Sequence, residues 1–330
     1  MGDYLKYPKD RKKYPTDEID PHHFYSDEEV REMIKNYDEL KFKQEDYLKL
    51  YNCVHCGLCE TEMERIKLKE KFLSQGLTLE GLKEMGECFQ NYRTPYPTNK
   101  MRIKIPEGIP EKSDTLFFMG CLSTIRIPNY TEHSLHYLLK QKIDFTILET
   151  EICCGWPWFA SGSMREFEVC KKENIEIFQN YKKVICLCPA CYFLFNKYYK
   201  PEMNSDTNFE YIIDYLKPSD SLKSGNVGVQ HLCQLINRGR DDVSETVDIL
   251  LKESGYNVLE IPHWCCGGGL GYMHRTDIID GVAKKRMEDF NREDLDFVTT
   301  YCVSCWWILS RFSKKCKIRP KAKDIFELLL

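Results

Sequence analysis

Short apolar runs and amphipathic segments alternate in the same order twice along the last two thirds of the chain. The short runs are rich in Val, Ile, Leu and Phe, which predicts buried strands, and the longer segments have helical spacing. Strands are expected at residues 114–121, 143–149, 182–188, 226–233, 256–261 and 295–302. Helices are expected at residues 129–142, 164–181, 243–254 and 277–293. The alternation predicts an α/β fold with parallel sheets covered by helices.

The chain before residue 115 has a different pattern. Residues 1–25 carry three prolines among tyrosines and charges, which predicts an irregular arm. Ser26 and Glu29 form a capping box, and apolar residues at helical spacing follow them, so a helix is expected in residues 26–40. Residues 91–114 are rich in proline and charge, which is typical of a linker.

Cysteine is the unusual residue, with 17 in a chain of 330. Ten of these cysteines form two sets of five with nearly the same spacing. The first set is Cys121, Cys153, Cys154, Cys188 and Cys191, and the second is Cys233, Cys265, Cys266, Cys302 and Cys305. The second set repeats the first at a distance of 112 residues for three cysteines and 114 for the other two. Such a match indicates an internal duplication.

Every cysteine of these sets follows a predicted strand, and sites in parallel sheets gather at the carboxyl ends of strands. Each set is therefore expected to converge. Five thiolates exceed the four of a zinc site or an ordinary cubane iron-sulfur cluster, which favours a larger centre with several metal atoms. Gly155 and Gly267, after the adjacent cysteines, let the backbone turn sharply beside a bulky cofactor. Two alternatives stay open: buried thiols without metal, or a zinc ribbon shared by Cys188, Cys191, Cys302 and Cys305.

A third group of cysteines precedes the duplication. Cys53, Cys56 and Cys59 have the spacing of a ferredoxin cluster, but no Cys-Pro follows them. Cys88 is the nearby unused thiol, so we expect it to be the fourth ligand of a [4Fe-4S] cluster. Zinc, a three-iron cluster and a ligand from a partner are the alternatives at this position.

Composition and charge narrow the range of possible functions and cell compartments. The net charge of -4 gives no basic footprint for nucleic acid. The first residues lack an apolar signal-peptide core, and Cys-x-x-Cys spacings with an odd cysteine count favour a reducing cytoplasm. No apolar run approaches the roughly 18 to 20 residues that span a bilayer. The glycines of residues 267–271 lack the spacing of a nucleotide loop, so a flavin or nicotinamide is expected on another subunit.

The five-cysteine spacing resembles the duplicated CCG domain of heterodisulfide reductase catalytic subunits and related iron-sulfur subunits. The resemblance covers about residues 115–330 and implies two tandem Rossmann-like CCG domains in a pseudo-twofold arrangement, preceded by a small helical ferredoxin-like segment. We expect an arm and helix in residues 1–45, the iron-sulfur segment and linker in 46–110, and the CCG domains in 111–222 and 223–330. The resemblance also implies that each complete cysteine set holds a non-cubane [4Fe-4S] cluster.

The implied function is that of an oxidoreductase subunit of heterodisulfide-reductase type, with an N-terminal [4Fe-4S] cluster feeding the two non-cubane clusters that reduce or form a disulfide. The alternative is a pure electron-transfer subunit of a flavin dehydrogenase or of a membrane complex linked to quinone. The expected partners are a flavin- or iron-sulfur-containing redox subunit, a membrane cytochrome and a small thiol or disulfide substrate.

Several residues beside the cysteines invite simpler interpretations. All five tryptophans lie within two residues of a proposed ligand, and we expect them to exclude water by apolar packing. Arg238 and Arg240 are expected at a solvated helix start rather than on an acidic substrate. His55 and His263 are expected to be satisfied neighbours of ligands. Cys170 and Cys186 are expected to be buried thiols without a ligand role.

Overall fold

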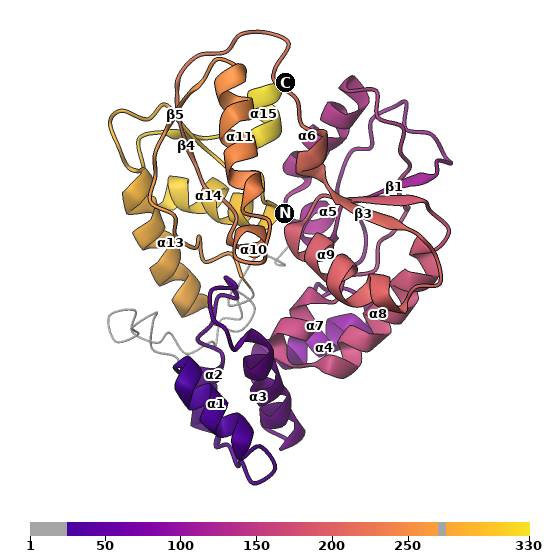
Figure 1. Ribbon diagram of the computed structural model, residues 1–330, viewed down its shortest axis with the longest axis vertical. Helices are drawn as coiled ribbons and strands as arrows, with labels where there is room; N and C mark the ends of the chain where they lie inside the picture. Colours follow the sequence, from indigo (N-terminus) through magenta and orange to yellow (C-terminus); the bar gives the residue numbers. More distant parts are fainter. Residues whose placement is uncertain (1–24, 270–274) are drawn as a thin grey trace.

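The computed structural model describes residues 25–269 and 275–330. The predicted arm over residues 1–25 therefore lies outside the described residues, apart from Tyr25. Two α/β halves lie side by side, and a small helical segment lies against one end of both (Figure 1). This arrangement confirms the predicted α/β class with two tandem repeats.

The first half contains a parallel sheet in the order β1-β2-β3. The strands are β1 (Thr115–Phe118), β2 (Lys183–Cys186) and β3 (Asn208–Tyr211). The helices and short turns are α5 (Cys121–Arg126), α6 (Pro128–Lys140), α7 (Trp156–Ser161), α8 (Met164–Phe178), α9 (Pro189–Leu194), η3 (Phe195–Tyr199), η4 (Lys200–Glu202) and η5 (Ile212–Tyr215). The last three residues of β1 and of β2 are buried, as expected for strands covered on both faces.

The second half repeats this plan with a four-stranded parallel sheet in the order β5-β4-β6-β7. Its strands are β4 (Asn226–Val229), β5 (Asn257–Leu259), β6 (Phe297–Thr299) and β7 (Lys321–Ala322). Its helices are α10 (Cys233–Ile236), α11 (Asp242–Glu253), α13 (Thr276–Phe290), α14 (Val303–Lys315) and α15 (Ile325–Leu329). The limits 111–222 and 223–330 remain our proposal for the two repeats.

The sequence-based strands differ from the structure at three places. The strand expected at residues 143–149 is reduced to a single bridge between Thr146 and Leu116, beside β1. The edge strands β3 and β7 were not expected, because they are short and carry polar residues that give no apolar run. The other five expected strands and all four expected helices are present.

The N-terminal segment is helical. It contains α1 (Asp27–Lys35), η2 (Gln44–Asp46), α2 (Tyr47–Leu50), α3 (Glu62–Ser74) and α4 (Glu80–Tyr92). The predicted capping box is present, since the Ser26 side chain accepts from Glu29 N and the Glu29 carboxylate accepts from Ser26 N. Residues 93–114 form neither helix nor strand, as expected for a linker.

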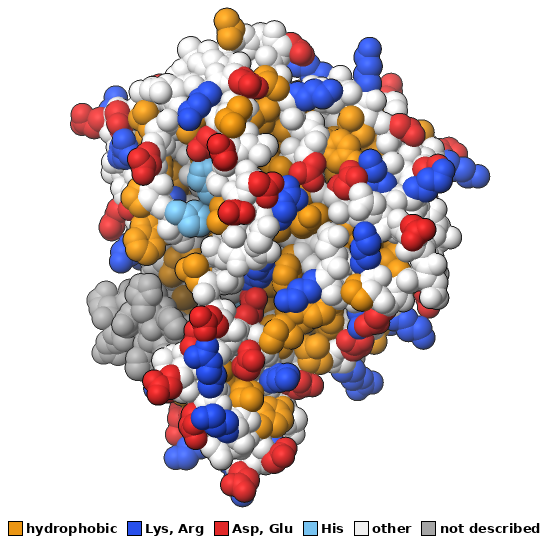
Figure 2. Space-filling model, in the orientation of Figure 1, with side chains coloured by type: hydrophobic (Ala, Val, Ile, Leu, Met, Phe, Trp, Pro, Cys, Tyr) orange, Lys and Arg blue, Asp and Glu red, His pale blue; other side chains and the backbone are white. Residues whose placement is uncertain are grey.

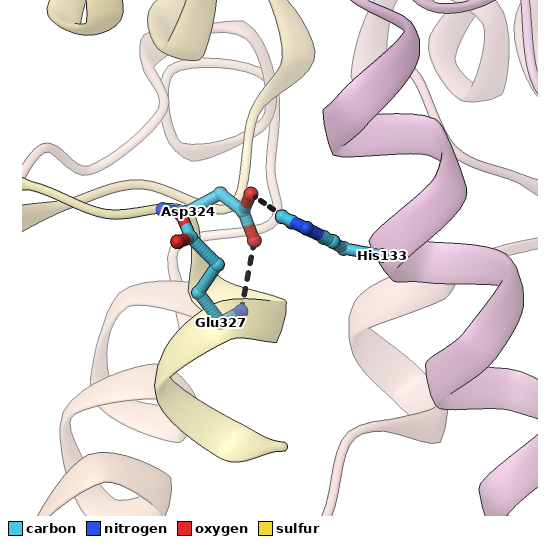
Figure 3. A group of neighbouring side chains, drawn as sticks. All are labelled: His133, Asp324 and Glu327. Atoms are coloured by element: carbon cyan, nitrogen blue, oxygen red, sulfur yellow. Dashed lines mark hydrogen bonds and ion pairs between the residues drawn. The ribbon is translucent and has the colours of Figure 1, made fainter. Parts of the chain in front are cut away.

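The last helix joins the two halves. The Phe326 ring of α15 packs edge-on against Tyr130 of α6, with ring centroids 5.2 Å apart. Asp324 caps α15 by accepting from Glu327 N, and its other oxygen lies 2.7 Å from His133 Nδ1 on α6 (Figure 3). The Asp324 side chain is buried, so this ion pair links the halves at a partly protected place.

The surface carries charges of both signs without a patch of one sign on the face shown in Figure 2. Among the described residues, no helix has both the length and the apolar character needed to cross a membrane.

The His133–Asp324 pair predicts a pH-dependent stability. The hydrogen bond to Asp324 raises the pKa of His133, so the stability added by the pair is fully present below the unfolded pKa of about 6.5 and is lost as the pH rises through the folded pKa. We expect H133N to cost up to about 1 kcal/mol at pH 5.5 and less at pH 9, as measured by urea unfolding. H136N, an exposed histidine on the same helix, is the control. A cost that grows with pH would contradict this assignment.

Candidate metal centres

The first cysteine set lies at the carboxyl ends of two neighbouring strands and in one loop. Cys121 begins α5 shortly after β1, and Cys188 precedes α9 shortly after β2. Cys191 lies in the first turn of α9, while Cys153 and Cys154 lie in the loop that leads into α7. The strand–turn–helix order thus turns three chain segments toward one end of the sheet.

The second set has equivalent positions in the other half. Cys233 begins α10 after β4, Cys302 precedes α14 after β6, and Cys305 lies in the first turn of α14. Cys265 and Cys266 lie in the loop after β5. The duplication of sequence is therefore a duplication of site geometry.

All ten cysteines line one cavity with an empty volume of about 780 Å³, part of which is open to solvent. Eight of them are buried, and Cys121 and Cys265 are half-buried. Apolar side chains, including Tyr96 and Leu232, line the same cavity. The two sets thus face a common space.

Sulfur atoms approach one another within each set. The Sγ atoms of Cys121 and Cys153 are 3.5 Å apart, and those of Cys266 and Cys305 are 3.2 Å apart. A mononuclear zinc site brings its donor atoms mutually close. Within residues 25–269 and 275–330, one group of at least three metal-ligating side chains has all its donor atoms within 4.8 Å of one another. This group is His133, Asp324 and Glu327, and it contains no cysteine. Both cysteine sets thus bring sulfur atoms into close pairs, and the five thiols of each set exceed the four ligands of a zinc site.

Burial raises the pKa of Cys153 and of Cys191 well above the ordinary value for cysteine, so these thiols are hard to ionise without a metal. At Cys154 burial is outweighed by the hydrogen bonds from Cys153 and Cys191, which hold the pKa well below that value. Burial also raises the pKa of Glu151 to about 7, although its carboxylate accepts hydrogen bonds from Met119 N at 2.7 Å and Gly120 N at 2.5 Å. Metal ligands must be thiolates, so a bound cationic centre supplies the charge that ionisation here requires. The donor set therefore fits iron-sulfur clusters.

Glycine is required beside both adjacent pairs. Gly155 has φ +82° and Gly267 has φ +81°, in the left-handed region that side chains disfavour. A Cβ on Gly155 would lie 2.8 Å from the Phe167 ring and 3.2 Å from Cys170 Cβ. The expected sharp turns are thus present, and the helix behind the first turn is packed against it.

The N-terminal cysteines lie in the loop between α2 and α3, and this loop rests on the second half. Gln234 Nε2 donates to His55 O at 2.7 Å, and Asn237 Nδ2 donates to Cys56 O at 2.7 Å. Burial raises the pKa of Cys56 to about 11, and the charge of Cys265 adds to this rise. The ferredoxin-like loop is therefore next to the second cysteine set.

Arg238 fastens this loop. Its guanidinium pairs with Glu62 of α3 and donates to His55 O at 3.3 Å. It also lies over the rings of Trp156 and Phe193 of the first half, at 5.6 and 4.9 Å from the ring centroids. The expectation of a solvated helix start is wrong for Arg238, because its side chain is 6% exposed.

The cysteine-rich domain model CCG matches the chain twice, over residues 115–196 and 227–310. These two matches cover half of the chain. The chain belongs to the CCG cysteine-rich domain family. The matched ranges include both five-cysteine sets.

Known proteins similar to this CCG protein come from several organisms. An uncharacterised iron-sulfur protein of Methanococcus maripaludis is 26% identical, over 87% of this chain and 63% of its own length. A subunit of the fumarate reductase (CoM/CoB) of Methanothermobacter marburgensis is 27% identical, over 64% of this chain and 45% of its own length. The chain thus spans about half to two thirds of these relatives. A hypothetical protein from Helicobacter pylori shares the fold, with a TM-score of 0.57, 10% identity, and coverage of 95% of this chain and 69% of that one.

Cys88 lies on a different element from the other three N-terminal cysteines. It lies in α4, where burial raises its pKa and the charges that add to this rise are those of Glu84 and Glu87. By contrast, the charge of Cys53 contributes to the raised pKa of both Cys56 and Cys59. A fourth ligand at Cys88 therefore stays a prediction without support from the geometry of this CCG protein.

The five tryptophans differ in burial, and Trp306 is half-buried. Trp156, Trp158 and Trp307 are buried, in agreement with a water-excluding role. Trp264 is 60% exposed, so the expected packing is wrong there, because its loop lies at the molecular surface. Cys170 and Cys186 are fully buried, as expected.

Sequence reasoning missed the residues that hold the N-terminal loop. Gln234 and Asn237 contact it from the second half, and Glu62 at the start of α3 pairs with the distant Arg238. Lys69 of α3 is buried beside His55, with Nζ 2.9 Å from His55 Nε2. No local pattern marks these residues, because their partners are far away in sequence. His55 itself is buried and hydrogen-bonded, as expected for a satisfied histidine.

The backbone conformation at Gly155 predicts that a methyl group added there destabilises the folded protein. G155A combines a disfavoured φ with a close contact to Phe167, and we expect it to destabilise the protein by about 1 to 3 kcal/mol. G281A, in α13 with open space around the added Cβ, is expected to be neutral or slightly stabilising. Urea unfolding measures both, and equal effects would contradict a strained turn at Gly155.

The contacts of Arg238 predict that replacing it destabilises the protein more than replacing Arg240 does. R238M leaves Glu62 without its partner at a buried place, and we expect a loss of about 3 kcal/mol in urea unfolding. R240M removes a more exposed pair with Asp242 and Asp214, and we expect a loss below about 1 kcal/mol. An R238M protein as stable as R240M would show that Arg238 does not fasten the loop.

Proposed function

We propose that this CCG protein is an iron-sulfur oxidoreductase subunit of heterodisulfide-reductase type. The observation that carries the proposal is the single cavity lined by both complete cysteine sets. In this proposal each set holds one non-cubane [4Fe-4S] cluster, and Cys53, Cys56 and Cys59 hold a further [4Fe-4S] cluster. When bound, these groups supply electron transfer in single-electron steps, and the protein supplies ligands, burial and orientation.

The proposed reaction takes place in the shared cavity. A small disulfide takes up two electrons and two protons, its S–S bond breaks, and two thiols leave. The reverse reaction forms the disulfide and releases the electrons. Tyr96 and Leu232 form part of the apolar wall against which the organic part of such a substrate can pack. The open part of the cavity provides a path for its entry.

The position of the N-terminal loop supports a direction for the proposed electron transfer. This loop contacts α10 of the second half through His55 and Cys56, so the second cysteine set is the proposed acceptor of its electrons. Electrons are proposed to arrive from a flavin- or iron-sulfur-containing subunit, with a membrane cytochrome as a further partner. The relative named as a subunit of a fumarate reductase (CoM/CoB) supports a place in such a complex.

The proposal predicts disulfide-dependent turnover. Protein purified without oxygen is mixed with dithionite-reduced viologen, and viologen oxidation is followed after addition of cystine, glutathione disulfide or the disulfide of coenzymes M and B. We expect at least one disulfide to be reduced. C154S and C266S, which each remove a proposed ligand, are expected to lower the rate by more than about tenfold. C170S, which alters a buried thiol outside both sets, is the control.

The same assay separates the alternative function. If none of these disulfides is reduced while the protein still passes electrons from viologen to a flavin or quinone analogue, the disulfide chemistry is contradicted. The pure electron-transfer subunit would then be favoured.

A further inference from the structure

Lys69 is a buried cation beneath the N-terminal cysteine loop. Its side chain comes from α3, and the residue is fully buried. Nζ lies 2.9 Å from His55 Nε2 and donates to Ala160 O at 2.9 Å. It also lies 5.2 Å from the centre of the Tyr51 ring. An ammonium group can only donate, so His55 Nε2 accepts and the imidazole carries its proton on Nδ1.

The packing around Lys69 leaves little room for the side chain to move toward solvent. Gly162, which ends α7, has φ +83°, and a Cβ there would lie 2.5 Å from Glu70 N and 2.8 Å from Lys69 Cβ. The backbone of α3 therefore lies directly against the end of α7. This close approach keeps the ammonium group inside the protein.

The carboxylates near Lys69 are paired with other cations. Glu62 pairs with Arg238, and Asp27 pairs with Arg65 at 2.9 Å. Within the described parts of the chain, no carboxylate lies within 4.0 Å of Lys69 Nζ. A buried charge without a partner costs several kcal/mol, so the site needs a negative group. Burial lowers the pKa of Lys69, while the charges of Cys53, Glu62 and Cys59 act in the opposite direction.

We propose that Lys69 is the internal counter-cation of the group held by Cys53, Cys56 and Cys59. The inference rests on the proposed N-terminal cluster. Thiolates and iron-sulfur centres carry negative charge, and reduction adds to it, so a fixed cation nearby favours the reduced form. Lys69 is a positioning residue that acts through His55 and through its charge, and it is not a ligand.

His55 connects the lysine to the ligand loop. It lies between Cys53 and Cys56, and its φ of +50° is unusual for a residue with a side chain. Its ring is held by Lys69 and its carbonyl accepts from Gln234 at 2.7 Å. Loss of the lysine therefore removes a charge that lies next to the ligand loop.

The test compares K69M with K67M, which alters an exposed lysine on the same helix, and with K69R, which keeps the charge. Each protein is purified without oxygen, and the N-terminal cluster is titrated by electron paramagnetic resonance. We expect K69M to shift the reduction equilibrium at least tenfold toward the oxidised form, which is 59 mV for one electron. K67M should leave the reduction potential of the cluster unchanged. K69R, which keeps the charge, should keep this potential close to that of the unaltered protein.

A second measurement keeps the proposal testable if K69M binds less iron. In metal-free protein Lys69 lacks its counter-charge, so K69M should unfold at the same or higher urea concentration than the unaltered chain. Lower stability of metal-free K69M would indicate a merely structural lysine and would overturn the proposal, as would a K69M potential equal to that of K67M. An unaltered protein without an N-terminal cluster signal would overturn the proposed cluster and this inference together. The disulfide assay described above tests the function of the CCG cavity independently of this inference about Lys69.

Discussion

The structure depends on gathering ten thiols, eight of them buried, around one space. Parallel sheets bring the carboxyl ends of their strands to one edge, and the duplication places two such edges against a common cavity. Buried thiols resist ionisation, so a cavity lined in this way is suited to a metal-sulfur centre that stabilises thiolates. Glycines with positive φ allow the adjacent cysteines to turn toward this space.

The two halves differ in what contacts them from outside. The N-terminal loop lies on α10 of the second half, and Arg238 joins it to both halves at once. Glu62 pairs with Arg238 and Asp27 pairs with Arg65, while Lys69 lies beside His55 of the loop. The loop also contacts the first half, where the centres of the His55 and Trp156 rings are 5.9 Å apart.

Much of this architecture could be predicted from local patterns. Apolar runs ending in cysteine located β1, β2, β4 and β6, and the repeated spacing indicated two equivalent sites. Contacts between distant segments could not be predicted in this way. Arg238 was expected in solvent because its helix start looks polar, yet Glu62 and two aromatic rings cover it. Cys88 was chosen for its proximity in sequence, and it lies in α4, outside the loop that carries the other three cysteines.

The most direct test of the account is the metal content of the chain purified without oxygen. Iron, acid-labile sulfide and zinc are measured on one sample, with electron paramagnetic resonance on the same material. Three four-iron clusters predict about twelve iron atoms and as many sulfides per chain. Two or three zinc ions without sulfide would contradict the account and leave the cysteine sets as structural zinc sites.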